Sequence, residues 1–534
     1  MPVTPSPVVV VGNGPVGQTA ALLLARLGVP VVLLDARPAR DPVGSKAICQ
    51  QRDVLDIWES VGAGQVLAEE GVTWTRARTF YRDTELFTVE FRDAGVSPFP
   101  PFVNISQSRT EQVLDEQIAR QSLIDVRWGH RVTAIDQNDA RAVVHCQTAQ
   151  GRRPVEGSYV VACPGARGDE LRRMLGVTFD GESFADQFLI CDIRTDLPGW
   201  ENERRFYFDP VWNPGRQVLI HPCPDSTYRI DWQVPDDFDL AYEEERGRLD
   251  ERIRQVIGDR DYETVWKSVY RFHARVVNRM RVGRVLIAGD GAHLVAPFGA
   301  RGLNSGVQDA ENAAWKIAFV RNGWAPDALL DSYHDERYAA ARENLEVTAA
   351  TMRFLVPHDD AEWERRRRVL EDAREDEAAR AVVDSGRLAE PFWYVDSPLT
   401  TPDYRGRFPG RPAKGCVPAP APGVLVPDLP VSVSGRPDMA RLRVLARSGI
   451  TVLTAPGADE HVAGLVTSGL GVPVNVHTMS ALSPQLCSVL GAQPREMWVI
   501  RPDGHIAAVL DDPDAVVLRR AIHRTLAITA PVPV

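Results

Sequence analysis

The chain has 534 residues, 44% of them hydrophobic and 25% charged, and its formal net charge at pH 7 is −11. This length is too great for one hydrophobic core, so two or three domains are expected. The composition is that of a folded protein, and the negative charge argues against a nucleic-acid partner because phosphate binding requires a concentrated basic face.

Seven cysteines are spread along the chain without a C-x-x-C pair or zinc-like spacing. We therefore expect reduced thiols, no disulfide framework and no metal site. The first residues lack the charged and apolar regions of a signal peptide, and no stretch approaches the roughly 18 apolar residues that a membrane helix needs. The sequence predicts a cytoplasmic protein without a membrane partner.

The first predicted elements form a β-α-β unit. Four valines at 8–11 are typical of a parallel strand that is buried on both faces. A glycine loop follows at 12–17, and an Ala/Leu-rich helix follows at 18–27, with a glycine directly after it. A second strand at 30–34 closes on Asp35.

Each glycine of the loop has a separate physical role. Gly12 permits a tight turn, Gly14 lets backbone amides approach a pyrophosphate, and Gly17 allows the helix to pack against the sheet. Asp35 lies 18 residues after Gly17, near the spacing of a carboxylate that accepts hydrogen bonds from ribose hydroxyls. The unit predicts dinucleotide binding, but FAD and NAD both use it, so this motif alone leaves the cofactor open.

A second motif follows a predicted buried strand late in the chain. The segment 284–291 ends in Gly-Asp-Gly, which includes Gly289 and Asp290, and His293 lies just beyond it. The segment 297–302 reads P-F-G-A-R-G and is typical of a turn. A helix is predicted from about Leu303, with the sequence L-N-S-G-V-Q-D-A-E-N-A-A-W-K.

This run resembles the signature of the class A flavoprotein monooxygenases, the aromatic hydroxylases, in which G-D-A-A-H, P-x-G-x-G and N-x-G-x-x-D-A-x-N-x-x-W-K follow one another. The resemblance favours FAD, covers most of the chain and is strongest to phenol hydroxylase and 3-(3-hydroxyphenyl)propionate hydroxylase types. It implies an α/β fold, in which a Rossmann-type FAD-binding domain carries an inserted antiparallel β-sheet substrate domain and a C-terminal thioredoxin-like α/β domain.

Domain boundaries follow from this reading. The FAD-binding domain is expected at 1–178 and, with additional helices, at 276–395. The substrate domain is expected at 179–275, a Pro-rich linker at 396–430, and the thioredoxin-like domain at 431–534.

The resemblance also implies roles for the second motif. Asp290 is expected to hydrogen-bond the ribityl chain of FAD, with Gly289 beside it, and the loop that precedes the helix is expected to lie along the isoalloxazine ring. The amides of Gly302, Leu303 and Asn304 would be the unsatisfied first donors of a helix whose dipole favours the negative charge of reduced flavin.

Candidate catalytic residues are Pro297, Gly302 and His293. His293 follows the strand closely enough to approach the site, but a packed, hydrogen-bonded histidine is at least as good an interpretation as an acid or a base. No dedicated catalytic base stands out in the sequence. This agrees with chemistry that is carried largely by the cofactor.

Two further positions match the family pattern. The family usually keeps an arginine beside the cofactor where this chain has Arg52, and a flavin-contacting glutamine where it has Gln107. Either residue taken alone is more often a surface residue.

Two departures from the family pattern concern the surroundings of the flavin. The family has a strand followed by D-G-A-R-S, whereas 163–168 reads C-P-G-A-R-G, so Pro164 replaces the acid. Because proline has no carboxylate and no amide hydrogen, we expect reduction by NAD(P)H to be slow or strongly dependent on substrate. Arg301 replaces a glutamine, and it either places a positive charge beside the flavin or turns outward to solvent or to an acid.

Between about 180 and 275 the pattern changes to short alternating strands, which is typical of an antiparallel sheet with one covered face. In the resembling family this sheet covers the flavin and holds the aromatic substrate. Candidate substrate contacts are Tyr207, Trp212, His221 and Trp232, although an aromatic residue at strand spacing is more often part of a core. Either face of the strand at 228–234 is a candidate lining of the pocket. The expected strands are 188–194, 204–208, 217–221, 228–234 and 263–272.

The C-terminal third is predicted to begin with helices over 325–390. After the Pro-rich stretch, four segments read as strands, and a hairpin turn at 501–505 precedes a fifth at 506–509. This part resembles the thioredoxin-like tail of phenol-hydroxylase-type proteins. Because it lacks C-x-x-C, and Cys416 and Cys487 are isolated, we assign it a structural or dimer-forming role, with a homodimer as one expectation. The four earlier strands are 442–445, 450–453, 474–476 and 497–500.

Three hypotheses for function follow. The first is an FAD-dependent monooxygenase that inserts one oxygen atom from O2 into a phenolic or polycyclic aromatic substrate, with NADH or NADPH as electron donor; the resemblance implies a flavin C4a-hydroperoxide as the oxygen donor. The second is Baeyer–Villiger oxygen insertion or epoxidation on the same scaffold. The third is a redox-neutral or non-catalytic flavin-binding protein impaired in NAD(P)H use, which Pro164 keeps open.

Overall fold

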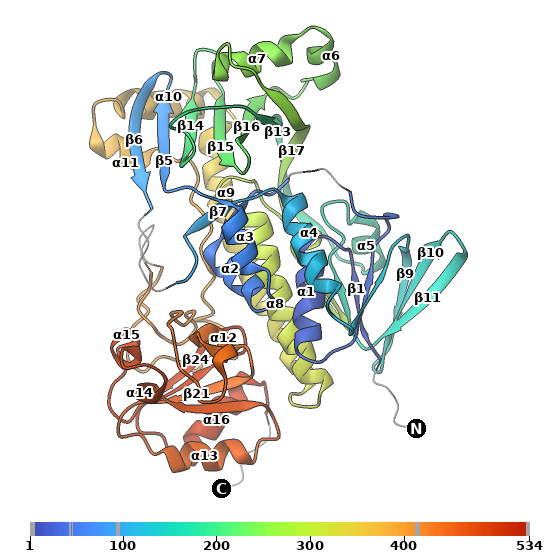
Figure 1. The fold of residues 1–534 in the computed structure, drawn as a ribbon, viewed down its shortest axis with the longest axis vertical. Helices are drawn as coiled ribbons and strands as arrows, with labels where there is room; N and C mark the ends of the chain where they lie inside the picture. Colours follow the sequence, from blue (N-terminus) through green and yellow to red (C-terminus); the bar gives the residue numbers. More distant parts are fainter. Residues whose placement is uncertain (1–5, 42–43, 45, 92–96, 412–416, 530–534) are drawn as a thin grey trace.

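The computed structural model describes residues 6–41, 44, 46–91, 97–411 and 417–529. Its fold is mixed α/β, as predicted, and comprises three parts along the long axis of the molecule (Figure 1). An eight-stranded sheet lies at one end, a parallel-sheet unit lies in the middle, and a smaller α/β unit lies at the other end. Among the described residues, no helix has the length and apolar character needed to cross a membrane.

The central unit is built on a six-stranded sheet with the strand order β18-β19-β12-β1-β2-β8. Parallel pairs join β1 to β2 and β12, β2 to β8, and β12 to β19, while β18 is antiparallel at the edge. The late strands β18 and β19 therefore complete a sheet that the N-terminal part of the chain begins. The strands are β1 (Val8–Val11), β2 (Val31–Leu34), β8 (Ile124–Arg127), β12 (Val160–Ala162), β18 (Arg281–Val282) and β19 (Val285–Ile287).

Two long helices pack closely beside this sheet. In α8 (Arg301–Arg321), a methyl group added at Gly306 would lie 2.7 Å from the Val16 side chain of α1 (Pro15–Arg26). This close approach places the starts of α1 and α8 side by side at one end of the sheet. The other helical segments of the unit are α2 (Arg52–Glu59), α3 (Gly64–Glu70), α4 (Gln107–Ile118), α5 (Asp169–Met174), η1 (Gly289–Gly291) and η2 (Asp327–Leu330).

Two small sheets accompany the central unit. One is antiparallel with the order β11-β10-β9, and the other has the order β3-β7-β4. Their strands are β9 (Arg131–Gln137), β10 (Ala142–Thr148), β11 (Gly151–Gly157), β3 (Cys49–Gln51), β7 (Phe102–Asn104) and β4 (Val72–Thr73).

The eight-stranded sheet has the order β20-β17-β13-β16-β15-β14-β5-β6. Its five central strands match the five strands predicted between 180 and 275. Three more come from outside that interval, and β14 pairs with β5 in parallel, a long-range pairing that no local pattern signals. The strands are β5 (Arg76–Tyr81), β6 (Thr84–Glu90), β13 (Phe179–Arg194), β14 (Glu203–Phe208), β15 (Gln217–Cys223), β16 (Thr227–Val234), β17 (Glu263–Val277) and β20 (His293–Leu294).

The two faces of this sheet have different coverings. The outer face packs against α6 (Leu240–Glu245) and α7 (Arg248–Ile257), which lie above the sheet in Figure 1. Side chains alternate along a strand, so β16 sends one set outward to these helices and the other set inward toward the central unit. The outward set is Tyr228, Ile230, Trp232 and Val234, and all four belong to one buried cluster with residues of α7.

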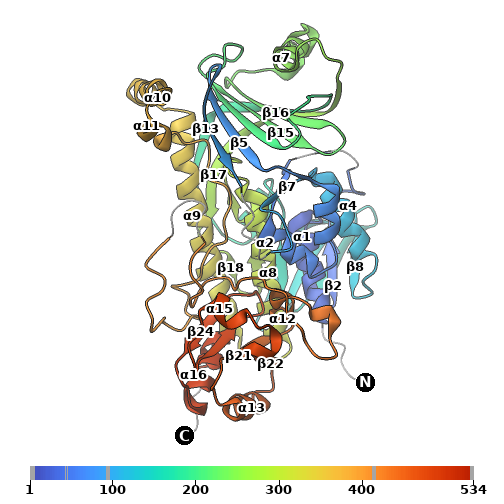
Figure 2. The same ribbon diagram turned by 60° about the vertical axis from the view of Figure 1, so that its left-hand side comes forward.

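Helix α9 (Asp331–Leu355) connects two parts of the molecule. Its first half packs against α8, and its C-terminal end contributes Met352 and Leu355 to the core under the eight-stranded sheet. Figure 2 shows it running upward beside β17 to α10 (Asp360–Asp372) and α11 (Glu377–Val382). The helices predicted over 325–390 are thus confirmed.

The C-terminal unit has a four-stranded sheet with the order β22-β21-β23-β24. Four of the five predicted strands are confirmed as β21 (Ile450–Thr454), β22 (Val474–Thr478), β23 (Met497–Ile500) and β24 (Ile506–Leu510). Its helical segments are η3 (Pro437–Met439), α12 (Leu442–Ala446), α13 (Glu460–Ser468), α14 (Met479–Leu482), α15 (Leu486–Leu490) and α16 (Ala515–Thr525).

The prediction of a strand at 442–445 was wrong, because this segment is the helix α12. The Asp428 carboxylate accepts a hydrogen bond at 3.2 Å from the backbone N–H of Arg443, in the first turn, and one at 2.7 Å from the side chain of Arg441. A carboxylate at a helix N-terminus stabilises it. Since the cap lies 15 residues upstream, local pattern could not reveal it.

The described residues 417–430 of the Pro-rich stretch contact the C-terminal unit. Gly423 and Val426 donate backbone hydrogen bonds to the carbonyls of Ile506 and Gly504, at 2.6 and 2.9 Å, so they lie along the hairpin before β24. Cys416 lies outside the described residues, and the six described cysteines are free.

Candidate functional site

The first glycine loop connects β1 to α1. A methyl group at Gly12, where φ is +103°, would lie 2.1 Å from the Cys163 carbonyl oxygen, and one at Gly17 would lie 1.9 Å from the Gly12 oxygen. Both glycines are therefore required by packing. A methyl group at Gly14 would meet no atom within 4 Å, so this position has an open side. The tight turn at Gly12 and the close packing at Gly17 are thus present, and the approach of a pyrophosphate at Gly14 stays a prediction.

Gly14 is also the N-cap of α1, and no side chain caps this helix start among the described residues. The first amides of a helix lack intrahelical acceptors, and the helix dipole favours an anion at that end. The open side of Gly14 and the uncapped amides together fit a pyrophosphate group.

Asp35, at the end of β2, accepts four hydrogen bonds. Its Oδ2 accepts from the Asn13 N–H at 2.8 Å and from Arg37 Nη2 at 3.0 Å, and its Oδ1 accepts from the N–H and Nε of Arg37 at 2.8 and 3.0 Å. Burial acts to raise the Asp35 pKa, but the bonds from Arg37 and Asn13 outweigh it and lower the pKa. A ribose hydroxyl would therefore have to replace one contact from Arg37.

Sequence reasoning missed Arg40, which joins the glycine loop to α4. Its Nη1 donates to the Asn13 carbonyl at 2.8 Å and to Glu111 Oε2 at 2.7 Å. Gln107, at the start of α4, donates from Nε2 to Glu111 Oε1 at 2.9 Å and accepts from the Ala47 N–H at 3.1 Å. The predicted residue Gln107 is thus connected to the first motif through Glu111.

The second motif follows β19. Gly289 adopts φ +62°, and its N–H donates to Asp309 Oδ2 at 2.9 Å. The neighbouring Asp290 side chain keeps an accessible surface although Gly289 and Gly291 on either side are buried. The protein groups near this exposed carboxylate partly desolvate it and raise its pKa, against the opposing charges of His293 and Lys46. Asp290 is therefore placed to accept hydrogen bonds from a polar ligand.

Helix α8 begins at Arg301, within the last residues of the predicted turn at 297–302. Its N-cap is Ala300, which adopts the left-handed conformation with φ +57° and, like any alanine, offers no capping group. The amides that follow, including those of Gly302 and Leu303, are not capped by a side chain among the described residues. Asn304 links this helix to β3, since its Oδ1 accepts from the Gln51 N–H at 2.9 Å and its Nδ2 donates to the Cys49 carbonyl at 3.0 Å.

His293 is fully buried and belongs to a charged network. Its Nε2 lies 2.7 Å from Asp309 Oδ2, while Asp309 Oδ1 accepts from Arg337 Nε at 2.6 Å. Burial acts to raise the Asp309 pKa, but His293 and Arg337 lower it. The geometry favours the packed, hydrogen-bonded histidine that the sequence left open, and a direct acid–base role for His293 stays a prediction without structural support.

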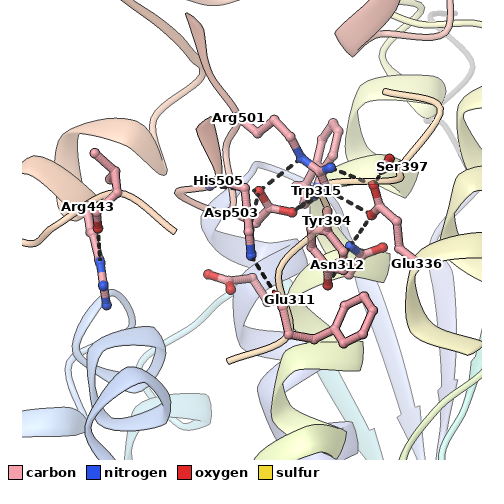
Figure 3. Close-up of polar contacts among 12 residues, drawn as sticks. Glu311, Asn312, Trp315, Glu336, Tyr394, Ser397, Arg443, Arg501, Asp503 and His505 are labelled. Atoms are coloured by element: carbon pink, nitrogen blue, oxygen red, sulfur yellow. Dashed lines mark hydrogen bonds and ion pairs between the residues drawn. The ribbon is translucent and has the colours of Figure 1, made fainter. Parts of the chain in front are cut away.

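A second group of buried polar contacts joins α8 and α9 to the C-terminal unit (Figure 3). Arg501 lies between two carboxylates, donating to Glu336 Oε1 and Oε2 at 2.5 and 2.9 Å and to Asp503 Oδ2 at 2.6 Å. Glu336 also accepts from Lys316 Nζ at 2.7 Å. Asp503 in turn accepts from Trp315 Nε1 at 3.1 Å. The hairpin before β24 is therefore joined to α9 by a buried ion pair and to α8 by a buried hydrogen bond.

Arg301 and Pro164 are the two residues that depart from the family pattern. Arg301 is buried and donates to the carbonyls of Arg387 and Leu388, at 3.2 and 3.0 Å, and to Asn344 Oδ1 at 2.7 Å. Its side chain does not turn to solvent, and it forms no ion pair with an acid among the described residues. Pro164 packs against Gly291 of the second motif, where an added methyl group would lie 2.6 Å from the Pro164 ring.

Pro297 and Arg52 complete the predicted set. Pro297 is exposed in the turn before α8, and its carbonyl accepts from the Ala300 N–H at 2.9 Å. Arg52 is half-buried at the start of α2, and its N–H donates to the Pro101 carbonyl at 3.1 Å.

Three of the four predicted substrate contacts need correction. Trp232 has no exposed surface and packs under α7. Tyr207 stacks on Phe80 with 4.6 Å between ring centroids, and Trp212 packs on its edge at 5.7 Å, in the same outer cluster. Strand parity, which the sequence could not orient, turns Tyr207 and Trp232 away from the central unit, and Trp212 lies in the turn between β14 and β15. His221 lies on the inner face.

Two regions of this chain match family models. Residues 5–348 match the FAD binding domain model, and residues 419–528 match the model for the C-terminal part of aromatic-ring hydroxylases. The chain belongs to the class A flavoprotein aromatic hydroxylases, a family of FAD-dependent monooxygenases. The open side of Gly14, the two uncapped helix starts and Asp290 fit the FAD that this family binds.

Curated relatives agree with this family. The chain is 32% identical over 372 residues to 3-(3-hydroxy-phenyl)propionate/3-hydroxycinnamic acid hydroxylase of Paraburkholderia xenovorans, a match that covers 66% of this chain and 57% of that protein. It is 29% identical over 392 residues to para-nitrophenol 4-monooxygenase of Pseudomonas sp., covering 70% of this chain and 93% of that protein.

Solved structures share the fold. The flavin-dependent monooxygenase PieE, in complex with FAD and substrate, superimposes with a TM-score of 0.84 at 22% identity, covering 99% of this chain and 100% of that one. Aklavinone-11 hydroxylase, in a ternary complex with FAD and aklavinone, superimposes with a TM-score of 0.78 at 23% identity and the same coverage.

Proposed function

We propose that this chain inserts one oxygen atom of O2 into a phenolic or polycyclic aromatic substrate, with FAD as cofactor and NADH or NADPH as electron donor. One observation carries the proposal. The uncapped start of α8 and the polar inner face of the eight-stranded sheet both contact the segment 46–51, through Asn304 on one side and Arg229 on the other. An aromatic ring that is bound beside this segment would meet both the flavin site and the sheet.

The cofactor contacts follow from the two motifs. The pyrophosphate would lie at the start of α1, and the isoalloxazine ring would lie along the turn before α8, where Pro297 is the exposed residue. The residues proposed to hold FAD are Gly12, Gly14, Gly17, Asp35, Arg52, Gln107, Gly289, Asp290, Gly302, Leu303 and Asn304.

When bound, FAD supplies the electron transfer and the activation of oxygen. The chain supplies binding and electrostatics. The positive end of the α8 dipole stabilises negative charge on the reduced ring system, because its first amides are preorganised. Beside the turn, Phe298 packs on the aromatic rings of Phe188 and Phe272, with centroid distances of 5.4 and 5.9 Å, and this apolar packing excludes water.

One observation supports a second candidate, a flavin-binding protein that NAD(P)H reduces poorly. Pro164 occupies the position of the family acid and packs directly against the Gly-Asp-Gly turn. It offers no carboxylate and no N–H there. In this case the enzyme would depend on another reductant or would catalyse a redox-neutral reaction.

Stopped-flow absorbance of the holoenzyme tests the proposal. The protein is mixed anaerobically with NADH or NADPH, with and without a panel of phenols and polycyclic aromatics. We expect bleaching of the flavin that a phenol accelerates, followed after addition of O2 by a hydroxylated product. Flavin that stays oxidised with both nucleotides and every aromatic compound would contradict the proposal and favour the second candidate. Product analysis distinguishes ring hydroxylation from Baeyer–Villiger insertion or epoxidation.

A further inference from the structure

The inner face of the eight-stranded sheet carries a group of charged side chains that we call the inner polar cluster: Asp192, Arg204, His221, Arg229 and Asp231. They come from four strands, β13 to β16. The strand register sets Asp192 and His221 on either side of Arg229, and Asp231 lies two residues further along β16. None of these residues belongs to the two cofactor motifs.

One ion pair within the cluster is complete. Arg229 donates from Nε and Nη2 to the two oxygens of Asp192, at 2.7 and 3.0 Å, and from Nη1 to the Lys46 carbonyl at 2.9 Å. Both side chains are almost fully buried. This pair is neutral as a unit, and it anchors the segment 46–51 to the sheet.

Asp231 and His221 are left with unused hydrogen-bonding atoms. Asp231 Oδ1 and His221 Nδ1 are shielded from water and have no hydrogen-bond partner among the described residues. The two side chains retain 20% and 13% of their surface, and 3.9 Å separates His221 Nε2 from Asp231 Oδ2, too far for a hydrogen bond. A shielded polar atom without a partner is costly, so these atoms point to a ligand that forms a hydrogen bond with them.

Arg204 supplies the remaining positive charge of the cluster. Its side chain is 5% exposed and donates from Nη2 to the Ser385 carbonyl at 3.3 Å, and no carboxylate lies within ion-pair distance of it in the described part of the chain. Burial lowers its pKa to about 10, so it remains a cation at neutral pH. Arg204 and Asp231 carry opposite charges within the cluster but do not form an ion pair with each other.

The cluster adjoins the flavin site. Arg229 binds the Lys46 carbonyl, and Cys49, three residues on, accepts from Asn304 in the first turn of α8. Cys49 also packs in one apolar group with Ala300, the N-cap of that helix. A single extended segment therefore separates the cluster from the helix start proposed to face the isoalloxazine ring.

We infer that Asp231 is the base that takes the hydroxyl proton of a neutral phenolic substrate, with His221 as a positioning residue and Arg204 facing the resulting phenolate. In this step the substrate O–H bond breaks, its electron pair stays on the oxygen, and the proton bonds to the Asp231 carboxylate. One negative charge moves from Asp231 to the substrate, so the charge of the buried cluster does not change. The inference rests on the proposed function and identifies its substrate as a phenol without a charged group at the reacting ring.

The acid–base properties of the cluster agree with this role. Burial raises the pKa of Asp231 to about 7, helped by Asp192 and opposed by Arg229 and Arg204. A base with a pKa near the working pH is the most effective. The other titratable groups around it are His221, whose pKa burial and the two arginines hold well below its usual value, and Cys223, whose pKa burial raises to about 12.

The test uses a binding measurement that needs no turnover. The holoenzyme is titrated anaerobically, without reductant, with 4-nitrophenol, whose phenolate absorbs visible light, and the apparent pKa of the bound phenol is recorded. Because a carboxylate disfavours a second negative charge beside it, we expect Asp231→Asn to lower this value by at least one unit and Asp231→Glu to keep it near that of the unchanged protein. Arg204→Gln, which removes the facing positive charge, should raise it. Asp180→Asn, at an exposed position of β13, is the control that should leave it unchanged.

An apparent pKa that is the same in Asp231→Asn and in the unchanged protein would overturn the inference, as would holoenzyme that binds 4-nitrophenol no better than protein lacking its FAD. Flavin absorbance and circular dichroism establish that each variant is folded and loaded. The inference and the proposed function fail separately. Phenol that is bound and ionised through Asp231 without any hydroxylated product contradicts only the function, whereas hydroxylation that Asp231→Asn leaves intact contradicts only the inference, which expects a loss of about 100-fold or more.

Discussion

Arg501, in the hairpin of the C-terminal unit, donates two hydrogen bonds to Glu336 of α9, at 2.5 and 2.9 Å. The next residue of α9, Arg337, donates to Asp309 at 2.6 Å, and Asp309 accepts from the N–H of Gly289 at 2.9 Å. A continuous set of buried contacts therefore connects the C-terminal unit to the turn that carries Asp290. We therefore expect the C-terminal unit to support this turn structurally, a role that needs no redox cysteines.

Replacing Arg501 is expected to destabilise the protein strongly. Arg501→Met leaves Glu336 and Asp503 buried without their main partner, and such a loss typically costs about 3–5 kcal/mol. Thermal unfolding and the affinity for FAD should both fall. The matched control is Arg342→Met on α9, which removes an exposed ion pair. Arg342 lies 3.7 Å from Glu346 at the surface, and such a pair stabilises the folded state by about 1 kcal/mol or less. Equal stability of the two variants would contradict the structural role.

The same ion pairs predict sensitivity to acid. Burial acts to raise the pKa values of Glu336 and Asp503, but Arg501 outweighs it and holds both below their usual range. Groups with a depressed pKa stabilise the folded state above the unfolded value, about 4, and lose that contribution as the pH falls through the folded value. Unfolding followed from pH 6 to pH 3 should therefore show steadily falling stability, with a shallower decline in Glu336→Gln. The same pH dependence in both proteins would count against this network.

The two glycines of the first loop should respond differently to alanine. Gly17→Ala places a methyl group 1.9 Å from the Gly12 oxygen and should destabilise even the protein without FAD. Gly14→Ala meets no protein atom within 4 Å, so stability without FAD should stay the same. Its methyl group would instead lie where the pyrophosphate approaches, and FAD affinity should fall about tenfold or more. Tight FAD binding by Gly14→Ala would show that the phosphate lies elsewhere.

Pro164 is expected to limit the rate at which NAD(P)H reduces the flavin. Pro164→Asp restores the family acid beside Gly291 and should accelerate reduction by NAD(P)H in stopped-flow experiments. Pro164→Ala, which removes the ring without adding an acid, separates the effect of the carboxylate from that of packing. A reduction rate that Pro164→Asp does not change would remove the reason for the second candidate function.

The sequence predicted the parts of the fold that depend on local pattern. Residue patterns within a few positions of one another predict these parts. They are the valine strand at 8–11, the glycine loop and the five strands of the inserted sheet. Predictions failed where a distant group decides. Asp428 accepts a hydrogen bond from the first turn of the helix at 442–446, and β14 pairs with β5, which lies more than a hundred residues upstream.

The candidate site shows the same division. The glycines and Asp290 belong to contiguous motifs, so the sequence could place them. Trp232 and Asp231 are neighbours on one strand, and only the packing of α7 on the outer face reveals that Asp231 is the inward residue. Asp231 was predicted only as part of an alternating strand, because its significance depends on Arg204 and His221, which come from other strands.

Aerobic turnover of the FAD-loaded protein with a neutral phenol, NADH or NADPH and isotopically labelled O2, followed by mass spectrometry of the product, is the decisive test of the proposed hydroxylation. We expect one labelled oxygen atom on the aromatic ring for each nucleotide oxidised. Oxidation of the nucleotide or of the phenol without labelled oxygen in the product would contradict the proposal.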